Sequence, residues 1–272
     1  MKIAHSLLFF LAFIFVQTTC FAGSKRVSIT IDDLPFVGEY RNFHLKMIMD
    51  ALKKQQVPAT GFIIAREVRK DNWEMLQQFR EEGFGLGNHT FSHANLNSMS
   101  AEDYIEDLRK ADTLLKPVLT QPKYFRFPYL AMGMGKKKKR VLAYLNKKHY
   151  HIAPITIDSK DFVFNQRLLS IPELNRRSYL AELKPFYLEF IEQQTKLAEE
   201  KTKNQVQIVL IHANLLNAYV LPDIIQLYKN RGYTFISLED ALESIKNYDP
   251  KSHPKENLTM SDASIESFME WD

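Results

Sequence analysis

Short apolar runs alternate with longer segments of helical pattern along most of this 272-residue chain. Helical segments between strands favour a parallel sheet with crossover helices, either open or closed into a barrel. The strands are expected at Val27–Ile31, Ala59–Ile64, Tyr124–Phe127, Ile152–Ile157, Val206–Ile211 and Thr234–Ile236. The pattern therefore predicts an α/β fold, although composition does not distinguish a barrel from a doubly wound sheet.

The first 22 residues have the pattern of a secretory signal peptide. Lys2 supplies the charged start, Leu7–Val16 the apolar region, and Cys20-Phe21-Ala22 the small-residue cleavage site before Gly23. The apolar run is shorter than the about 20 residues that a transmembrane helix needs. We therefore expect a secreted or periplasmic protein that contacts the membrane only if this segment is retained.

The remaining 250 residues (272 minus 22) contain no linker rich in Gly, Ser or Pro. They can fill one barrel-sized domain, placed at residues 23–248 and followed by a polar tail, flexible or draped on the surface, at 249–272. The single cysteine lies in the signal segment, so the mature chain cannot form a disulfide. Loss of Lys2 lowers the formal charge from +4 to +3. Nucleic acid is not an expected partner, because the exported chain lacks an aromatic and basic platform.

The sequence contains an acidic pair and a histidine pair with the residue types of a metal site. Asp32 and Asp33 come directly after the first apolar run, and His89 and His93 have ligand spacing. One carboxylate and two imidazoles form a three-ligand set that leaves a position for water, which is typical of catalytic zinc. The second carboxylate is then free to act as a base. Each pair alone also has a structural explanation, such as a turn or a helix cap for the two aspartates.

Three later segments carry residue types that a metal-assisted amide or ester hydrolysis needs. They are Arg126-Phe127-Pro128-Tyr129, Asp158-Ser159-Lys160-Asp161-Phe162 and Leu210-Ile211-His212, each after a strand-like run. Because βα loops form the active face of an α/β barrel, these side chains are expected to meet at one end of the sheet. Arg126 or His212 alone could equally be a surface ion-pair residue or a core histidine.

With these five segments in order, the chain resembles the polysaccharide deacetylases, the carbohydrate esterase family whose shared unit is the NodB homology domain. The resemblance covers roughly Lys25 to Lys246. It implies a distorted (β/α) barrel of about seven strands rather than a regular eight. It also implies a divalent metal, most simply Zn²⁺, with Co²⁺, Mn²⁺ or Ni²⁺ as other options, and an acetylated polysaccharide as substrate.

The resemblance also assigns roles to single residues. Asp33, His89 and His93 would ligate the metal, with Asp32 as general base and the backbone N–H of Tyr129 as oxyanion donor. His212 is the candidate general acid, supported by Asp161 or Asp158. Arg126 would orient Asp32 and lower its pKa. Leu210 and Phe162 would line a small pocket for the acetyl methyl group.

Several functions are compatible with this set of residues. The first is a de-N-acetylase acting on N-acetylglucosamine-containing glycan, with peptidoglycan as the leading substrate. Ester and amide cleavage need the same site, so an O-deacetylase of acetylated xylan, or a deacetylase of chitin or exopolysaccharide, is the alternative. A glycan-binding protein without turnover is a different class. That class has no need of both a base and an acid, which disfavours it here.

Three further segments carry structural predictions. Ser100 and Asp103 have the spacing of a capping box that opens a helix to Leu115. Leu174–Lys201 is expected to be mostly helical and broken near Pro185, serving either as packing or as one wall of the substrate groove. Lys136–Arg140 is either a solvated helix start or a loop that meets an anionic polymer.

Overall fold

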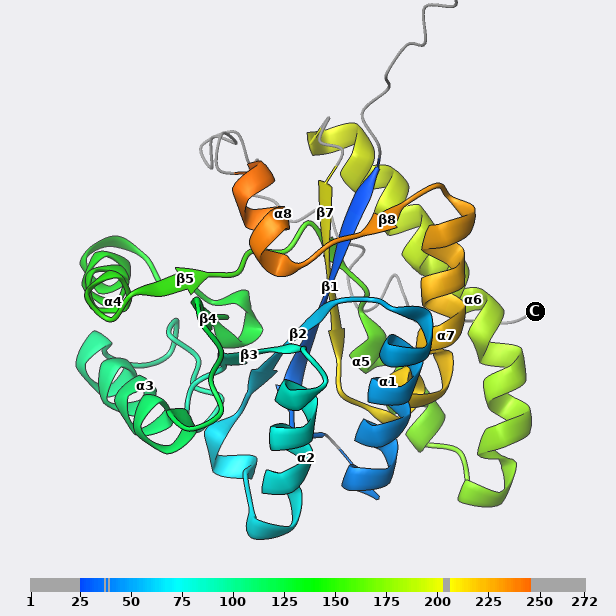
Figure 1. Cartoon of the computed structure of the whole chain (residues 1–272), viewed down its shortest axis with the longest axis horizontal. Helices are drawn as coiled ribbons and strands as arrows, with labels where there is room; N and C mark the ends of the chain where they lie inside the picture. The colour runs from blue at the N-terminus through cyan, green and yellow to red at the C-terminus, as the bar shows by residue number, and fades with distance from the viewer. Residues whose placement is uncertain (1–24, 37, 39, 203–205, 246–272) are drawn as a thin grey trace, which may run out of the picture.

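The computed structural model describes residues 25–36, 38, 40–202 and 206–245. The predicted signal peptide and the tail at 249–272 lie outside these residues. The described strands form one parallel sheet in the order β5-β4-β3-β2-β1-β7-β6, and short β8 pairs with β1 (Figure 1). Their bounds are β1 Arg26–Leu34, β2 Ala59–Ile63, β3 Gly85–Asn88, β4 Lys123–Phe125, β5 Tyr150–Ile152, β6 Ile157–Asp158, β7 Val206–His212 and β8 Thr234–Phe235.

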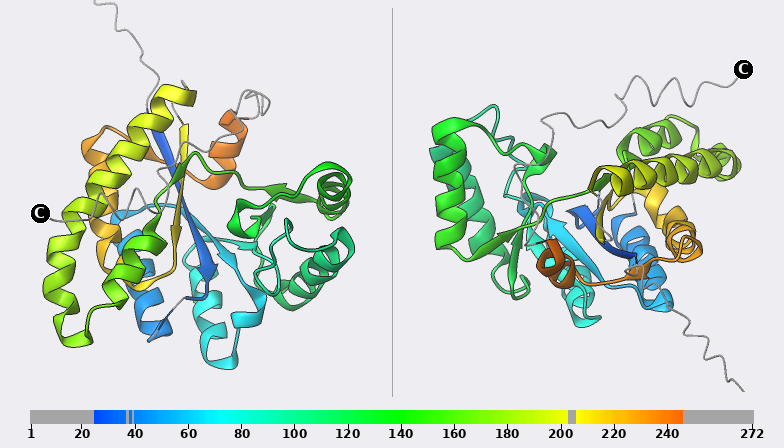
Figure 2. Two further views of the ribbon diagram at one scale, coloured as in Figure 1. Left: turned by 180° about the vertical axis from the view of Figure 1, so that it is seen from behind. Right: turned by 90° about the horizontal axis from the view of Figure 1, so that it is seen from above.

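The sheet curls into a half-barrel, and helices lie around its outside (Figure 2). The helices are α1 Arg41–Gln55, α2 Lys70–Glu81, α3 Ala101–Leu115, α4 Gly135–Lys147, α5 Asp161–Leu169, α6 Glu173–Thr202, α7 Leu215–Asn230 and α8 Leu238–Ile245, with short 3₁₀ turns η1 Ala65–Glu67 and η2 Pro128–Leu130. The predicted distorted α/β barrel in a single domain is therefore confirmed. Among the described residues, none of these helices combines the length and apolar character that crossing a membrane requires.

The core lies between the sheet and the helices that cover it. Val27, Ile29 and Ile31 of β1 have no exposed surface, and neither do Leu45 and Ile48 of α1. Burial of such a side chain contributes about 1.5–3 kcal/mol relative to its exposed state. This packing holds the carboxyl ends of the central strands in fixed positions, where the candidate site residues lie.

The strand predicted at Ile152–Ile157 is wrong, because the chain divides there between the two edges of the sheet. β5 pairs with β4 at one edge, and β6 pairs with β7 at the other. Between them, the amide of Ala153 donates to the Phe125 carbonyl and the amide of Thr156 donates to the Ile208 carbonyl, both at 2.9 Å. The segment thus crosses the gap between the edge strands, a path that a continuous apolar run does not reveal.

Strand β3 was not predicted, because its sequence Gly85-Leu86-Gly87-Asn88 has low strand propensity. The glycines are explained by packing. A Cβ atom at Gly87 would lie 2.7 Å from the Phe62 ring and 2.9 Å from the Tyr124 carbonyl oxygen. The close approach of β3 to its neighbours therefore requires a residue without a side chain here.

The predicted helix segments are largely found. Ser100 caps α3, and its hydroxyl accepts from the Asp103 amide at 3.0 Å, which confirms the predicted N-terminus. The expected break near Pro185 is wrong, since α6 continues through that residue. Its middle buries Tyr187 and Phe190 in the core, as expected of a packing element. The run Lys136–Arg140 lies in the first turns of α4, so it is a helix start.

Candidate active site

The two aspartates lie where β1 departs from regular geometry. Asp32 is opposite His212 in the register with β7, while the register with β2 shifts between Ile31 and Leu34. Asp33 adopts a left-handed backbone with φ of 63°. The strand does not end at Ile31, as the sequence suggested, but continues to Leu34 through this irregularity. The change of direction lets both carboxylates reach one side, which regular alternation along a strand would prevent.

The histidine pair lies on a loop after β3 rather than on a helix. Thr90 and His93 have φ values of 67° and 59°, so the loop curls and brings the two rings within 5.0 Å of each other. Asp107 of α3 holds the loop, since its carboxylate accepts from the amides of Phe91 at 2.9 Å and Ser92 at 3.1 Å. The loop geometry is thus supported by hydrogen bonds from a neighbouring helix.

Asp33, His89 and His93 converge as a potential metal-binding cluster. Oδ1 of Asp33 lies 3.6 Å from Nε2 of His89 and 3.4 Å from Nε2 of His93, and the three ligand atoms lie within 4.8 Å of one another. Oδ1 of Asp33 and Nε2 of His89 are buried and make no hydrogen bond among the described residues. Buried polar atoms normally have partners, so this pair of unsatisfied atoms indicates a missing ligand such as a cation.

Protonation states in the cluster also suit a metal ion. Burial lowers the pKa of His89 to about 3 and that of His93 to about 4, so both imidazoles are neutral at neutral pH. Burial raises the pKa of Asp33 to about 6, which leaves the carboxylate largely ionised at pH 7. The Nδ1 atom of His89 lies 2.9 Å from the Arg126 carbonyl oxygen, which fixes the ring with Nε2 toward the cluster. The residues present therefore fit a divalent metal.

Asp32 lies beside this cluster and is paired with a buried arginine. Its Oδ2 atom lies 3.6 Å from Nε2 of His89. Nη1 of Arg126 lies 3.1 Å from Oδ1 of Asp32, and the guanidinium also donates to the Thr30 hydroxyl at 3.1 Å and to the Ala153 carbonyl at 3.0 Å. Arg126 contacts Asp32, and its charge acts to lower the pKa of Asp32, as predicted, but burial has the larger effect. Burial raises the pKa of Asp32, and the Arg126 charge offsets this only in part.

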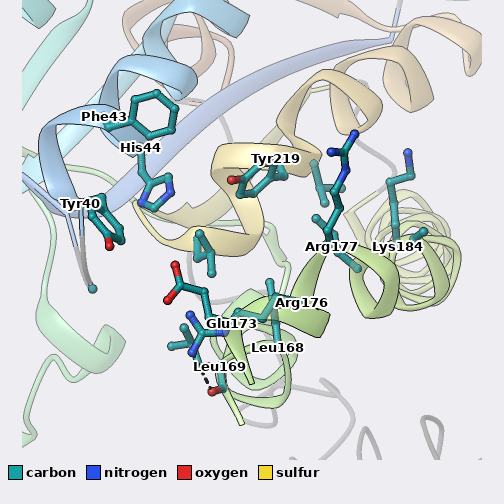
Figure 3. Close-up of a pocket in the computed structure, with 15 residues that line it drawn as sticks. Tyr40, Phe43, His44, Leu168, Leu169, Glu173, Arg176, Arg177, Lys184 and Tyr219 are labelled. Atoms are coloured by element: carbon teal, nitrogen blue, oxygen red, sulfur yellow. Dashed lines mark hydrogen bonds between the residues drawn. The ribbon is translucent and has the colours of Figure 1, made fainter. Parts of the chain in front are cut away.

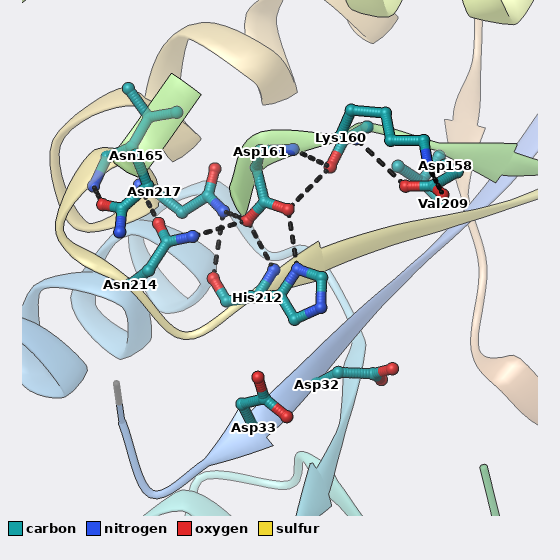
Figure 4. A network of polar contacts seen from close by, with 12 residues as sticks. Asp32, Asp33, Asp158, Lys160, Asp161, Asn165, Val209, His212, Asn214 and Asn217 are labelled. Atoms are coloured by element: carbon teal, nitrogen blue, oxygen red, sulfur yellow. Dashed lines mark hydrogen bonds and ion pairs between the residues drawn. The ribbon is translucent and has the colours of Figure 1, made fainter. Parts of the chain in front are cut away.

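His212 and Asp161 form the opposite side of the site (Figure 4). Oδ1 of Asp161 lies 2.7 Å from Nδ1 of His212, and Oδ2 accepts from the His212 amide at 2.8 Å. Burial opposes a charge on the imidazole, but the Asp161 carboxylate outweighs it and raises the pKa of His212 to about 10. Asp158 instead pairs with Lys160 at 3.4 Å. Of the two aspartates left open by the sequence, Asp161 is the one that contacts His212.

The metal-type cluster with Asp32 and, opposite it, His212 line one cavity of about 420 Å³. Leu210, Phe162 and Tyr129 all line it, as do the metal cluster, Asp32 and His212. The Phe162 ring lies edge-on to His212 with centroids 6.1 Å apart, and the Tyr129 ring lies 4.5 Å from that of His93. Tyr129 has a left-handed backbone, with φ of 55°. The five predicted segments thus meet at one cavity, at the carboxyl ends of the strands.

The family model for polysaccharide deacetylase matches residues 22–153, which contain four of the five residues of the Asp32, Asp33, His89, His93 and His212 set. Over these residues the chain belongs to the polysaccharide deacetylase family. Members of the family are hydrolases that act on amide bonds, and the Asp/His/His cluster described above is a possible metal site of the kind the family uses.

Curated relatives of the family match about half of the chain. A chitin deacetylase of Colletotrichum lindemuthianum is 29% identical over 150 residues, which cover 52% of this chain and 54% of that protein. A peptidoglycan-N-acetylglucosamine deacetylase of Bacillus cereus is 28% identical over 141 residues, covering 52% of this chain and 47% of that protein. The chain therefore spans about half the length of these relatives.

The fold is shared with solved structures of the same family. A CE4 family pseudoenzyme from Bacillus anthracis superposes with a TM-score of 0.60 and 21% identity, covering 81% of this chain and 66% of that chain. This similarity concerns the fold alone. Because a pseudoenzyme has the same fold, catalytic competence has to be argued from the site residues of this deacetylase family member.

Two asparagines of the site were not predicted from the sequence. Asn214 donates to Oδ2 of Asp161 at 2.7 Å, and Asn217 donates to the same oxygen and to the His212 carbonyl. Burial would raise the pKa of Asp161, but the charge and hydrogen bonds of His212, together with the bond from Asn214, lower it. The available signal was their position, since Asn214, two residues after His212, caps α7, and Asn217 is three residues further on.

Proposed function

We propose that this chain is a metal-dependent de-N-acetylase that removes acetyl groups from N-acetylglucosamine units of peptidoglycan. The observation that carries the proposal is the arrangement around one cavity: three metal-type ligands and Asp32 on one side, and a protonated His212 on the other. The predicted signal peptide and the bacterial relative named for peptidoglycan support an exported enzyme with this substrate.

Asp33, His89 and His93 would hold the ion. When bound, a divalent metal supplies a Lewis acid that polarises oxygen and lowers the pKa of water toward about 7. Asp32, oriented by Arg126, takes the proton from the attacking water, and its raised pKa suits a base. The backbone N–H of Tyr129 donates to the developing oxyanion. Leu210 and Phe162 contact the acetyl methyl group.

Cleavage of an amide needs a proton on the leaving nitrogen, and His212 is placed to give it. With the pKa raised to about 10 by Asp161, His212 is protonated at neutral pH. An aryl ester with a good leaving group has no such need, so loss of the general acid should matter more for an amide than for an aryl ester. The carboxylate of Asp161 is fully buried and held by two asparagines, which keeps the imidazolium in place.

Acetate release is the direct test of the proposal. The purified protein should release acetate from peptidoglycan more efficiently than from acetylated xylan, and a chelator should abolish the release. Chitin oligomers serve as a third substrate, because they share the sugar but lack the peptide. Activity confined to acetylated xylan would refute the assignment, and activity unaffected by chelator would refute the metal.

The histidine ligands should control metal content. We expect about one divalent ion per chain in the parent and little in His89→Ala or His93→Ala, because each variant removes one of three ligands. Metal analysis after dialysis measures this. The control is His151→Ala, an exposed histidine of β5 outside the cavity. Retention of the ion by both ligand variants, as tightly as by the parent, would show that the ligands lie elsewhere.

His212→Ala should lose far more activity on an N-acetylglucosamine oligomer than on an aryl acetate. The amide requires protonation of its leaving nitrogen, and a general acid contributes roughly 10²–10⁴-fold. Measuring both substrates controls for misfolding, since a collapsed site loses both activities. Equal losses with unchanged metal content would exclude His212 as the general acid.

Asp161→Asn should move the alkaline limit of activity to lower pH. The carboxylate stabilises the imidazolium and raises the pKa of His212, so its removal lowers that pKa. The acid form is then lost at a lower pH than in the parent. The pH dependence of kcat/KM on a chitin oligomer measures the shift. An unchanged alkaline limb would mean that another group titrates there.

A further inference from the structure

The protein has a second cavity that is larger than the catalytic one, and Figure 3 shows the residues that line it. It has a volume of about 910 Å³ and is bounded by the starts of α1, α6 and α7 and by the end of α5. We call it the lateral groove. The proposed chemistry uses none of its residues, and the two cavities have no lining residue in common.

The lateral groove exposes unusually many aromatic side chains. Tyr40 is 66% exposed, Phe43 63% and Tyr219 46%, and all three line it. Its floor is aliphatic, with Leu168, Leu169, Leu180, Ala181, Leu215 and Val220. An exposed apolar surface of this kind marks an interaction site. Sugars present hydroxyl groups that need polar partners, so the aliphatic floor favours a peptide over a glycan.

Basic side chains from α6 border the apolar floor. The Arg176 guanidinium donates hydrogen bonds to the carbonyls of Ile171 and Leu169. Lys184 forms an ion pair with Asp223 at 3.0 Å. Arg177 is exposed and has no hydrogen bond or ion pair among the described residues. A guanidinium in this position favours a ligand that carries a carboxylate next to an apolar side chain. Glu173 is the acidic residue of the lining, so the basic charge is concentrated toward Arg177 and Lys184 (Figure 3).

The chain itself contains a segment of matching chemistry. Residues 262–272 read DASIESFMEWD, with four acidic residues, no basic residue, and the apolar side chains Ile265, Phe268, Met269 and Trp271. We propose that this acidic, aromatic segment binds the lateral groove, with Phe268 and Trp271 on the aliphatic floor and a carboxylate on Arg177. The proposal does not depend on the proposed enzymatic activity.

The connecting chain is long enough for this contact. Between Ile245, the last residue of α8, and Phe268 there are 23 residue steps, which span at most about 75 Å when extended. A compact domain of this size has a radius of gyration of about 17 Å, and hence a diameter of about 45 Å. The segment can therefore reach the lateral groove from the opposite end of the barrel, where α8 lies (Figure 1).

Trp271 makes the contact measurable in the full chain. The sequence has two tryptophans, and Trp73→Phe leaves Trp271 as the single reporter. In this background we expect blue-shifted emission and weak quenching by acrylamide, a neutral quencher. Arg177→Glu, or Tyr40→Ala with Phe43→Ala, should shift the emission to the red and raise the quenching constant roughly twofold, since a buried aromatic ring gains solvent contact on release.

Two further variants separate a specific contact from a general charge effect. Combining Arg177→Glu with Glu266→Arg and Glu270→Arg should restore the parent emission, because the charges are exchanged. Lys110→Glu reverses an exposed charge on α3, across the molecule from α6 (Figure 1), and should change nothing. Emission typical of solvated indole in the Trp73→Phe parent would overturn the proposal. The proposal would also be overturned if the red shift of the Arg177→Glu emission persisted in the charge-exchange variant.

Discussion

Asp32→Asn should abolish most turnover while the protein keeps its metal, whereas Asp33→Asn should lose metal as well. The two carboxylates are adjacent in sequence and both approach His89, but Asp32 pairs with Arg126 whereas Asp33 pairs with His93. Oδ1 of Asp32 contacts Arg126, and Oδ1 of Asp33 faces the imidazoles of His89 and His93. Removal of a general base costs roughly 10²–10⁴-fold in rate.

The comparison uses acetate release and metal content measured on the same samples. Asparagine is nearly isosteric with aspartate, so the two variants differ from the parent mainly in charge and proton affinity. Circular dichroism of both variants checks that the fold is intact. Equal metal loss in the two variants would contradict the assignment of Asp33 as ligand and Asp32 as base. Full turnover by Asp32→Asn would exclude Asp32 as the base.

Arg126→Met should be among the most destabilising single substitutions in the chain. The guanidinium is fully buried, joins Asp32 and Thr30 of β1 to Ala153, and lies 4.6 Å from the centre of the Phe62 ring. It therefore connects the central strand to the segment that crosses between the edge strands. Breaking a buried ion pair by removing one partner costs about 3–5 kcal/mol, since the other charge is left without compensation.

Urea unfolding with chelator present measures this loss without a contribution from metal binding. The same substitution in an Asp32→Asn background should cost less, because no buried charge is then left uncompensated. Coupling of about 0.5–3 kcal/mol is expected between residues in contact. If Arg126→Met lowers the free energy of unfolding by less than about 1 kcal/mol, a value typical of an exposed ion pair, then Arg126 does not contribute strongly to the stability of the barrel.

Much of the fold could be predicted because strands and helices have local signatures. The apolar runs of β1, β2 and β7 were found, and so was the cap of α3 at Ser100. β3 was missed because glycine is a poor strand former, and its two glycines are explained only by tertiary contacts: Gly85 lies against Thr60, and Gly87 lies against Phe62 and Tyr124. The division into β5 and β6 was also missed. An apolar run does not specify which strand pairs with it.

The sequence by itself indicated which residues form the candidate site, because the carboxyl ends of parallel strands share one edge and four of the five motifs follow strand-like runs. The tertiary structure alone decided how they are paired and charged. It assigned Asp161 rather than Asp158 to His212, added Asn214 and Asn217, and made burial outweigh Arg126 in the pKa of Asp32. The physical reason is that pairing and pKa depend on distances and desolvation between segments far apart in the chain.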